Sequence, residues 1–183
     1  MSARAKSRRQ RWISIVIAGL VAVVTVGLAP HASAVETPIG RLGETLRVEF
    51  ADIVADVTVH DVLPTEVPPG WGWNGSPRWR AQGGPWRAPV TVHTIQAPNP
   101  YKIAIAFTFN GVTPYADAYT SKHTDAPDAL ETALQNAPPG STVDGAVYWD
   151  VYRARVTNVV LLNPQTGRHL AQWNLWEPGT PLP

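Results

Sequence analysis

Apolar and polar residues alternate at period two in several segments, and this pattern constrains the fold more than any other feature of the chain. Along 52–60, one side of an extended chain carries only apolar residues, whereas the other side is mostly polar. The same alternation recurs over 147–152, where Trp149 falls on the apolar side. Successive side chains of a strand point to opposite faces, so we predict half-buried strands here, with Trp149 in the core.

Similar segments elsewhere bring the predicted number of strands to about eight. These segments are 44–50, 52–60, 87–96, 101–109, a return strand from Val112, 147–152, 156–162 and 170–176. A two-residue hairpin is predicted at Asn110-Gly111, because both residue types tolerate the positive φ angles of such a turn. Another turn is predicted over 163–167, where Asn, Pro and Gly cluster.

One short helix is predicted between Asp125 and Pro138. Asp125 can cap it, Pro127 suits its first turn, and Asp128 complements the positive end of the helix. One helix among about eight strands predicts an all-β fold, an antiparallel immunoglobulin-like β-sandwich whose two sheets bury their apolar faces against each other. The chain has no cysteine, so this fold has no disulfide and depends on its core.

Residues 1–34 have the pattern of a secretory signal peptide. Five basic residues precede an uncharged stretch over 13–28, and Ala32-Ser33-Ala34 provides a small-residue cleavage site. The uncharged stretch is shorter than the roughly 20 residues that span a bilayer, so no membrane span is expected after cleavage. Arg8-Arg9 also occurs in signals for export of folded proteins, but Arg11-Trp12 follows where those signals are apolar, which favours the general route. We predict an extracellular, secreted protein that is either released or stays associated with the cell envelope.

The predicted domains are the signal peptide (1–34), one sandwich domain (35–178) and a C-terminal tail (179–183). All 14 acidic residues lie after Ala34, whereas five of the 15 Lys and Arg residues lie before it, so the mature chain has a formal charge of −4. A mildly acidic domain without a basic run lacks the electrostatic footprint of a nucleic-acid-binding protein. No nucleic-acid partner is therefore expected.

Two apparent ligand motifs do not fit their structural requirements. Residues 70–75 read G-x-G-x-x-G, but prolines flank them where a dinucleotide site has a strand and a helix. Asp52, Asp56, His60 and Asp61 resemble metal ligands, yet residues four apart on a strand are separated by about 13 Å. We therefore predict a solvated strand face, no metal site and no cofactor.

No motif for covalent or hydrolytic catalysis is visible. The absence of cysteine excludes thiol chemistry, and the serine signature G-x-S-x-G does not occur. A pair of carboxylates for glycoside hydrolysis stays open, because residues that meet only in space leave no sequence pattern. The prediction is a protein that is not an enzyme, and the alternative is a secreted hydrolase with an unrecognised carboxylate site.

Residues 64–89 differ from the rest of the chain. They contain six prolines, five glycines and four tryptophans, so regular structure is not expected, and so long a loop is either functional or flexible. The candidate binding residues are Trp71, Trp73, Trp79 and Trp86, because exposed tryptophans are frequent in interface hot spots. The alternative is that these indoles fold back and close one end of the sandwich.

Three short motifs in order resemble a known family. Pro38–Gly43, Ala146–Val151 and Leu175–Pro178 are similar to segments of the secreted immunogenic proteins of mycobacteria, the immunoprotective extracellular protein family. The resemblance covers about 38–178 and implies an immunoglobulin-like β-sandwich without a disulfide, an extracellular location and antigenicity. It supplies no catalytic residues. The loop over 71–86 is longer and richer in tryptophan than its counterpart in the family, so a shared partner is not implied.

These observations predict a secreted, non-enzymatic immunoglobulin-like module of unknown specific activity. A rigid sandwich presents its loops at either end, where binding residues are frequent. We expect an unknown protein or surface glycan to bind such end loops. Besides the hydrolase, a purely structural or antigenic envelope protein is the remaining hypothesis, since a fold does not decide a function.

Overall fold

The structure is a computed structural model that describes residues 36–66, 70 and 74–175. All of them belong to one compact unit that begins at Glu36. The predicted signal peptide, the tail over 179–183, and the candidate binding residues Trp71 and Trp73 lie outside the described residues. No helix in the described part of the chain is long and apolar enough to cross a membrane.

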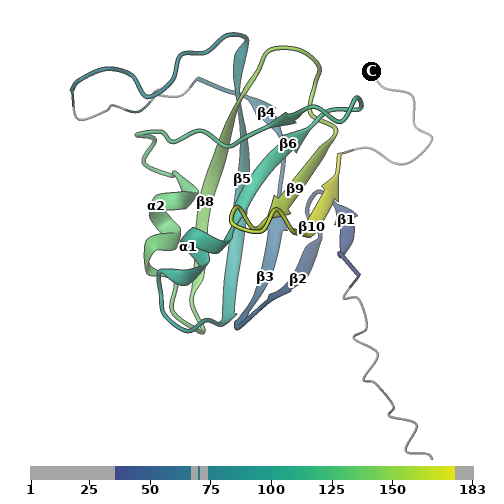
Figure 1. Cartoon of the computed structure of the whole chain (residues 1–183), viewed down its shortest axis with the longest axis vertical. Coiled ribbons are helices and arrows are strands. Elements are labelled where there is room, and N and C mark those ends of the chain that lie inside the picture. The colour runs from purple at the N-terminus through teal and green to yellow at the C-terminus, as the bar shows by residue number, and fades with distance from the viewer. Residues whose placement is uncertain (1–35, 67–69, 71–73, 176–183) are drawn as a thin grey trace, which may run out of the picture. The chain divides into compact units, whose positions relative to one another are not determined.

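Two five-stranded sheets pack face to face (Figure 1). The strands of the first sheet are, in spatial order, β1 (Ile39–Arg41), β10 (His169–Asn174), β9 (Asn158–Leu162), β6 (Thr108–Val112) and β7 (Ala118–Tyr119). The second sheet contains β2 (Thr45–Phe50), β3 (Ile53–Val59) and β5 (Gly84–Gln96), with β4 (Leu63–Pro64) and β8 (Thr142–Val151) both paired to β5. Only β1 and β10 run parallel among the pairs of described strands.

The predicted all-β sandwich is confirmed, with ten described strands in place of about eight. Strands β1 and β4, which were not predicted, have three and two residues, and so short a strand leaves no alternation to detect. Of the return strand predicted from Val112, only the two-residue strand β7 forms. The pattern over 52–60 predicted β3 correctly: Ile53, Ala55, Val57 and Val59 are fully buried, and the residues between them are partly exposed.

Two buried indoles link the sheets across the core. Trp149 of β8 donates its Nε1–H to the carbonyl oxygen of Phe109 in β6 at 3.0 Å. Trp173 of β10 donates its Nε1–H to the carbonyl oxygen of Glu44, just before β2, at 2.9 Å. Both rings are fully buried, so each satisfies its one polar atom while filling the space between the sheets. The prediction that Trp149 lies in the core is confirmed.

The prediction of a strand over 101–109 is wrong, because helix α1 (Lys102–Ala106) occupies most of this segment. The side-chain oxygen of Asn99 accepts the N–H of Tyr101 at 3.1 Å, and its backbone carbonyl accepts the N–H of Lys102 at 3.2 Å. This turn starts the helix, whose buried residues Ile103 and Ala106 lie three apart on one face. The apolar residues of this segment fit the helical period of 3.6 residues as well as the strand period of two, and the turn at Asn99 favours the helix.

The hairpin predicted at Asn110-Gly111 is also wrong. Both residues lie inside β6 and pair with β9. A Cβ atom on Gly111 would lie 2.9 Å from Cγ2 of Val156 and 3.3 Å from the ring of Trp149, so glycine serves close packing here. The actual turn spans 113–117, where the Thr113 hydroxyl accepts two backbone N–H groups.

The predicted helix over 125–138 exists but begins later. Helix α2 (Leu130–Ala133) continues into the 3₁₀ helix η1 (Leu134–Asn136), and Figure 1 shows α1 and α2 together beside β8. Ala129 occupies the N-cap position without a side-chain cap, so the expected capping by Asp125 is wrong. The turn predicted over 163–167 is present and connects β9 to β10, with the Asn163 side chain accepting the N–H of Thr166 at 2.9 Å.

Candidate functional site

The tryptophan-rich segment is anchored to the sandwich at both of its described indoles. Trp79 is half-buried and donates its Nε1–H to the carbonyl oxygen of His123 at 3.0 Å. Trp86 lies within β5, half-buried against the core and opposite Trp149 in the β5–β8 register. The structure therefore does not bring these two candidate residues together on one loop, and their role in binding stays a prediction.

The expectation that 64–89 lacks regular structure is wrong from Gly84 onward. Pro85 and Pro89 lie in β5, although proline has no N–H for the ladder. Their carbonyl oxygens still accept hydrogen bonds, from Thr65 at 2.9 Å and from His60 at 3.0 Å. Each proline therefore removes one donor only, and β5 continues through both.

The end of this loop is fixed by a buried carboxylate. Asp150 of β8 is 4% exposed, and its oxygens accept the backbone N–H groups of Gln82 at 2.7 Å and Gly83 at 3.1 Å. A Cβ atom on Gly83 would collide with the carbonyl oxygen of Val151 and lie 2.5 Å from Cα of Tyr152. Glycine at position 83 thus allows the loop to lie directly against the end of β8.

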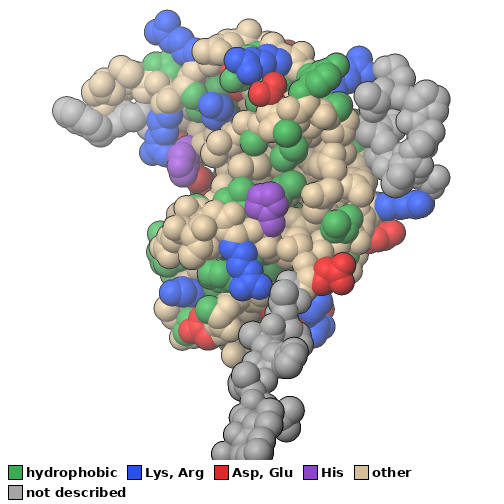
Figure 2. Space-filling view, turned by 45° about the vertical axis from the view of Figure 1, so that its right-hand side comes forward, with side chains coloured by type: hydrophobic (Ala, Val, Ile, Leu, Met, Phe, Trp, Pro, Cys, Tyr) green, Lys and Arg blue, Asp and Glu red, His purple; other side chains and the backbone are tan. Residues whose placement is uncertain are grey.

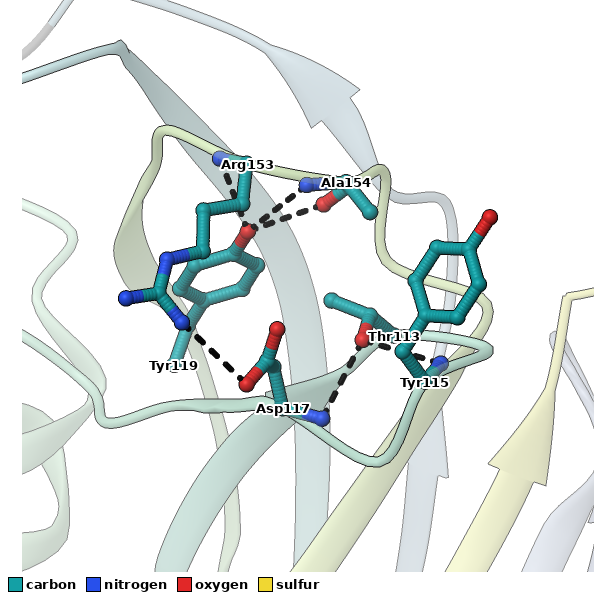
Figure 3. Close-up of polar contacts among 6 residues, drawn as sticks. All are labelled: Thr113, Tyr115, Asp117, Tyr119, Arg153 and Ala154. Atoms are coloured by element: carbon teal, nitrogen blue, oxygen red, sulfur yellow. Dashed lines mark hydrogen bonds and ion pairs between the residues drawn. The ribbon is translucent and has the colours of Figure 1, made fainter.

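A buried tyrosine fixes the loop between β8 and β9 at the same end of the sandwich (Figure 3). The Tyr119 hydroxyl donates to the carbonyl oxygen of Ala154 at 2.9 Å and accepts the N–H groups of Arg153 and Ala154, each at 3.1 Å. This resembles the tyrosine corner of immunoglobulin domains, in which a tyrosine hydroxyl binds nearby backbone. All three hydrogen-bonding positions of the hydroxyl are used, so the loop has a defined conformation.

Beside this anchor, four side chains form what we call the end-loop surface, namely Tyr115, Asp117, Tyr152 and Arg153. Tyr115 is 81% exposed and Tyr152 is 49% exposed. Arg153 lies 5.6 Å from the ring centroid of Tyr152 and forms an ion pair with Asp117 at 3.4 Å. Figure 2 shows Lys and Arg side chains together with hydrophobic ones near this upper end of the sandwich.

A polar pocket of about 320 Å³ lies on the outer face of the second sheet. In it, the Thr91 hydroxyl donates to Asp144 at 2.7 Å and also bonds to Nε2 of His60 at 3.0 Å. The single hydroxyl proton is committed to the carboxylate, so Nε2 of His60 is the donor in the second bond. The chain of bonds therefore runs from His60 through Thr91 to Asp144.

The same pocket contains a second carboxylate, Asp128. Its oxygens accept hydrogen bonds from Arg87 at 2.5 and 3.0 Å and from the Tyr148 hydroxyl at 2.5 Å. Burial alone would raise the pKa of Asp128, but the hydrogen bonds from Tyr148 and Arg87 outweigh burial and lower it. Burial raises the pKa of Tyr148, and its hydrogen bond to Asp128 raises it further.

Two carboxylates of this pocket bear on the hydrolase alternative. Asp128 and Asp144 both line it, which is the arrangement that the hydrolase alternative requires. A general acid needs a raised pKa, whereas the pKa of Asp128 is lowered. Asp128 therefore does not fit the role of the general acid of such a pair.

The residues that resemble metal ligands in the sequence do not converge. Asp56 forms an ion pair with Arg47 at 2.5 Å, which lowers the pKa of Asp56, and His60 bonds to Thr91. In the part of the chain that the structure describes, no three His, Asp or Glu side chains gather as metal ligands.

A second pocket, the helix-side pocket, has a volume of about 260 Å³ and lies where residues 120–134 cover the side of the sandwich. Buried apolar side chains form its base: Phe107, Phe109, Leu130, Leu134 and Val147. Polar side chains line the remainder, namely Thr108, Thr120, Ser121, Lys122, His123, Thr124 and Glu131. Nothing in the sequence marks this pocket, because its residues come from five separate segments.

Comparisons with known proteins support the fold. No protein-family model matches the chain, and no curated protein matches it. The structure is similar to the 1.5 Å crystal structure of MPT63, a secreted protein from Mycobacterium tuberculosis, with a TM-score of 0.58 and 22% identity over 76% of this chain and 98% of that chain. A proposed lipoprotein from Staphylococcus aureus aligns with a TM-score of 0.38 and 7% identity over 70% of this chain and 90% of that chain. The likeness to MPT63 confirms, at the level of the fold, the predicted resemblance to a secreted mycobacterial protein.

Proposed function

We propose that this protein is a secreted, non-enzymatic immunoglobulin-like module that binds another protein through the end-loop surface. The observation that carries the proposal is the Tyr119 hydroxyl, which holds the backbone of Arg153 and Ala154 while the side chains of Tyr152 and Arg153 face solvent. A loop that is ordered before binding loses little conformational entropy when a partner docks.

The side chains of this surface are of the types that contribute most to protein interfaces. Tyr and Arg are enriched among hot-spot residues. Tyr115 is 81% exposed. The Tyr152 ring contacts Tyr119 edge-on with 5.5 Å between centroids, so this ring is held in place while part of it stays solvated. Burial of Tyr115 and Tyr152 by a partner would remove apolar area from water. This composition favours a protein partner over a glycan.

Secretion is supported by the signal-peptide pattern over 1–34. The likeness of the fold to a secreted protein of Mycobacterium tuberculosis agrees with it. An extracellular location would make the protein accessible to a host immune system, which accounts for the antigenicity that the resemblance implies. The lowered pKa of Asp128 argues against this carboxyl as the general acid of the hydrolase alternative.

The test compares two tyrosine variants with the wild-type protein. Tyr115→Ala/Tyr152→Ala removes both exposed rings of the end-loop surface, whereas Tyr101→Ala removes a similarly exposed ring, 51% exposed, at the start of α1. Each immobilised protein is incubated with envelope proteins, host extracellular proteins and a glycan array. We expect a protein partner that binds wild type and Tyr101→Ala and is lost with the double variant.

Two results would contradict this function. A protein partner retained by the double variant would place binding elsewhere on the molecule. Glycan binding that depends on Tyr115 and Tyr152 would show that the end-loop surface binds a different class of ligand.

A further inference from the structure

The helix-side pocket combines an apolar base with a polar rim, which is the usual composition of a small-ligand site. Its base consists of side chains that are each at most 7% exposed, including Phe109, Leu134 and Val147. They belong to the core of the sandwich itself. An apolar ligand group placed here would therefore extend the core.

The volume of the pocket sets the size of a ligand. About 260 Å³ equals the volume of about nine water molecules at roughly 30 Å³ each. A methylene group occupies a similar volume, so an unbranched chain of about ten non-hydrogen atoms fits.

The charges at the rim determine the polar group of a ligand. Nδ1 of His123 pairs with Glu131, so the carboxylate of Glu131 is already engaged. Lys122 also lines the pocket, and its ammonium group makes no hydrogen bond or ion pair with the described residues. The Lys122 ammonium is therefore an unengaged cationic donor at the rim and complements an anion.

We propose that the helix-side pocket binds a small amphipathic carboxylate, a medium-chain fatty acid or an arylalkyl acid of similar size. The apolar part lies against Phe107, Phe109, Leu130 and Leu134, and the carboxylate accepts a hydrogen bond from the Lys122 ammonium. This site is independent of the end-loop surface.

Octanoate is the probe, because it has ten non-hydrogen atoms and one carboxylate. Binding to the secreted protein purified from expression of the full chain is measured by titration calorimetry. A ligand that binds only the folded state also raises the melting temperature, which gives a second readout. We expect saturable binding of octanoate, and binding of the neutral alcohol octanol that is at least fivefold weaker.

Three variants locate the site. Ala104→Leu adds three carbons to a half-buried position of α1 that lines the pocket, and leucine suits a helix. This variant should abolish binding while it keeps the circular dichroism spectrum of the fold. Lys122→Met should weaken the binding of octanoate at least fivefold and leave the affinity for octanol unchanged. The matched control is Lys102→Met, which alters the other lysine of the described chain outside the pocket and should bind like wild type.

Three outcomes would overturn the proposal. Absence of saturable binding at millimolar octanoate would show that the pocket is not a binding site for this ligand. Binding that survives in Ala104→Leu would place the ligand elsewhere. Equal affinity for octanoate in Lys122→Met and wild type would refute the role of the cationic rim. The double variant Tyr115→Ala/Tyr152→Ala should retain full octanoate binding, so failure of the proposed function leaves this test unaffected.

Discussion

The hydroxyl of Tyr119 bonds to both backbone polar groups of Ala154, a residue 35 positions away in the sequence. It donates to the carbonyl oxygen at 2.9 Å and accepts the N–H at 3.1 Å. The bond connects β7 at the edge of the first sheet to the loop that leaves β8 of the second sheet. One side chain thus sets the position of a loop whose neighbouring residues, Tyr152 and Arg153, are exposed.

Tyr119→Phe should destabilise the protein, because the backbone groups of Arg153 and Ala154 lose their partner. Unsatisfied polar groups of this kind cost about 1–3 kcal/mol. Urea unfolding followed by fluorescence measures the loss, and hydrogen exchange should show faster exchange at residues 153–154. The control Tyr115→Phe removes an exposed hydroxyl and should leave both unchanged. Equal stability of Tyr119→Phe and wild type would contradict the anchoring role.

Neighbouring glycines provide a matched test of the loop closure at Asp150. Gly83→Ala should destabilise strongly, by about 2 kcal/mol or more, since a Cβ there collides with the backbone of Val151 and Tyr152. At Gly84 nothing lies within 4 Å of an added Cβ, so Gly84→Ala should change the stability by less than about 1 kcal/mol. The measurement is the free energy of unfolding of the two variants. Similar values would refute the close approach of Gly83 to the backbone of Val151 and Tyr152.

Two tryptophans that donate to carbonyl oxygens should respond differently to replacement by phenylalanine. Trp149→Phe leaves a cavity in the core and the carbonyl of Phe109 without its donor, which should cost about 2–4 kcal/mol. Trp79 also donates its indole N–H but is half-buried, so Trp79→Phe should cost about 1 kcal/mol or less. Chemical denaturation of both variants measures this difference. A larger loss of unfolding free energy for Trp79→Phe than for Trp149→Phe would mean that the tryptophan-rich segment contributes to the core.

The ion pair between Asp128 and Arg87 should make the free energy of unfolding depend on pH. Because the pKa of Asp128 is lower in the folded than in the unfolded state, the fold favours the ionised carboxylate. This stabilisation is complete above the unfolded pKa of about 3.9 and is lost as the pH falls through the folded pKa. Asp128→Asn should therefore be less stable than wild type near neutral pH, and the difference should shrink below about pH 4.

Unfolding free energies of both proteins between neutral and acidic pH provide the measurement. Tyr148→Phe removes one of the hydrogen bonds that lower the pKa of Asp128, so its acid transition should move to higher pH. A difference between Asp128→Asn and wild type that stays constant with pH would show that the carboxylate does not titrate in this range.

The sheets were predictable where one face of a strand is buried along its whole length. The residues of β3 alternate strictly between buried and partly exposed, and the pattern over 52–60 shows this directly. Asn110-Gly111 misled the prediction, because a glycine that allows a turn also allows close packing, and only the approach of Trp149 and Val156 distinguishes the two. The strand assigned over 101–109 failed for a related reason, since its apolar residues fit a helix as well.

By itself, the sequence determined an all-β sandwich without a disulfide, because the period of two is a local property of each strand. It also determined that the indole of Trp149 is buried. Only the tertiary structure decided which polar groups meet: Tyr119 with Ala154, Asp150 with Gly83, and Arg87 with Asp128. The end-loop surface and the helix-side pocket arise in the same way. Their residues are far apart in the chain, and packing of the two sheets brings them together.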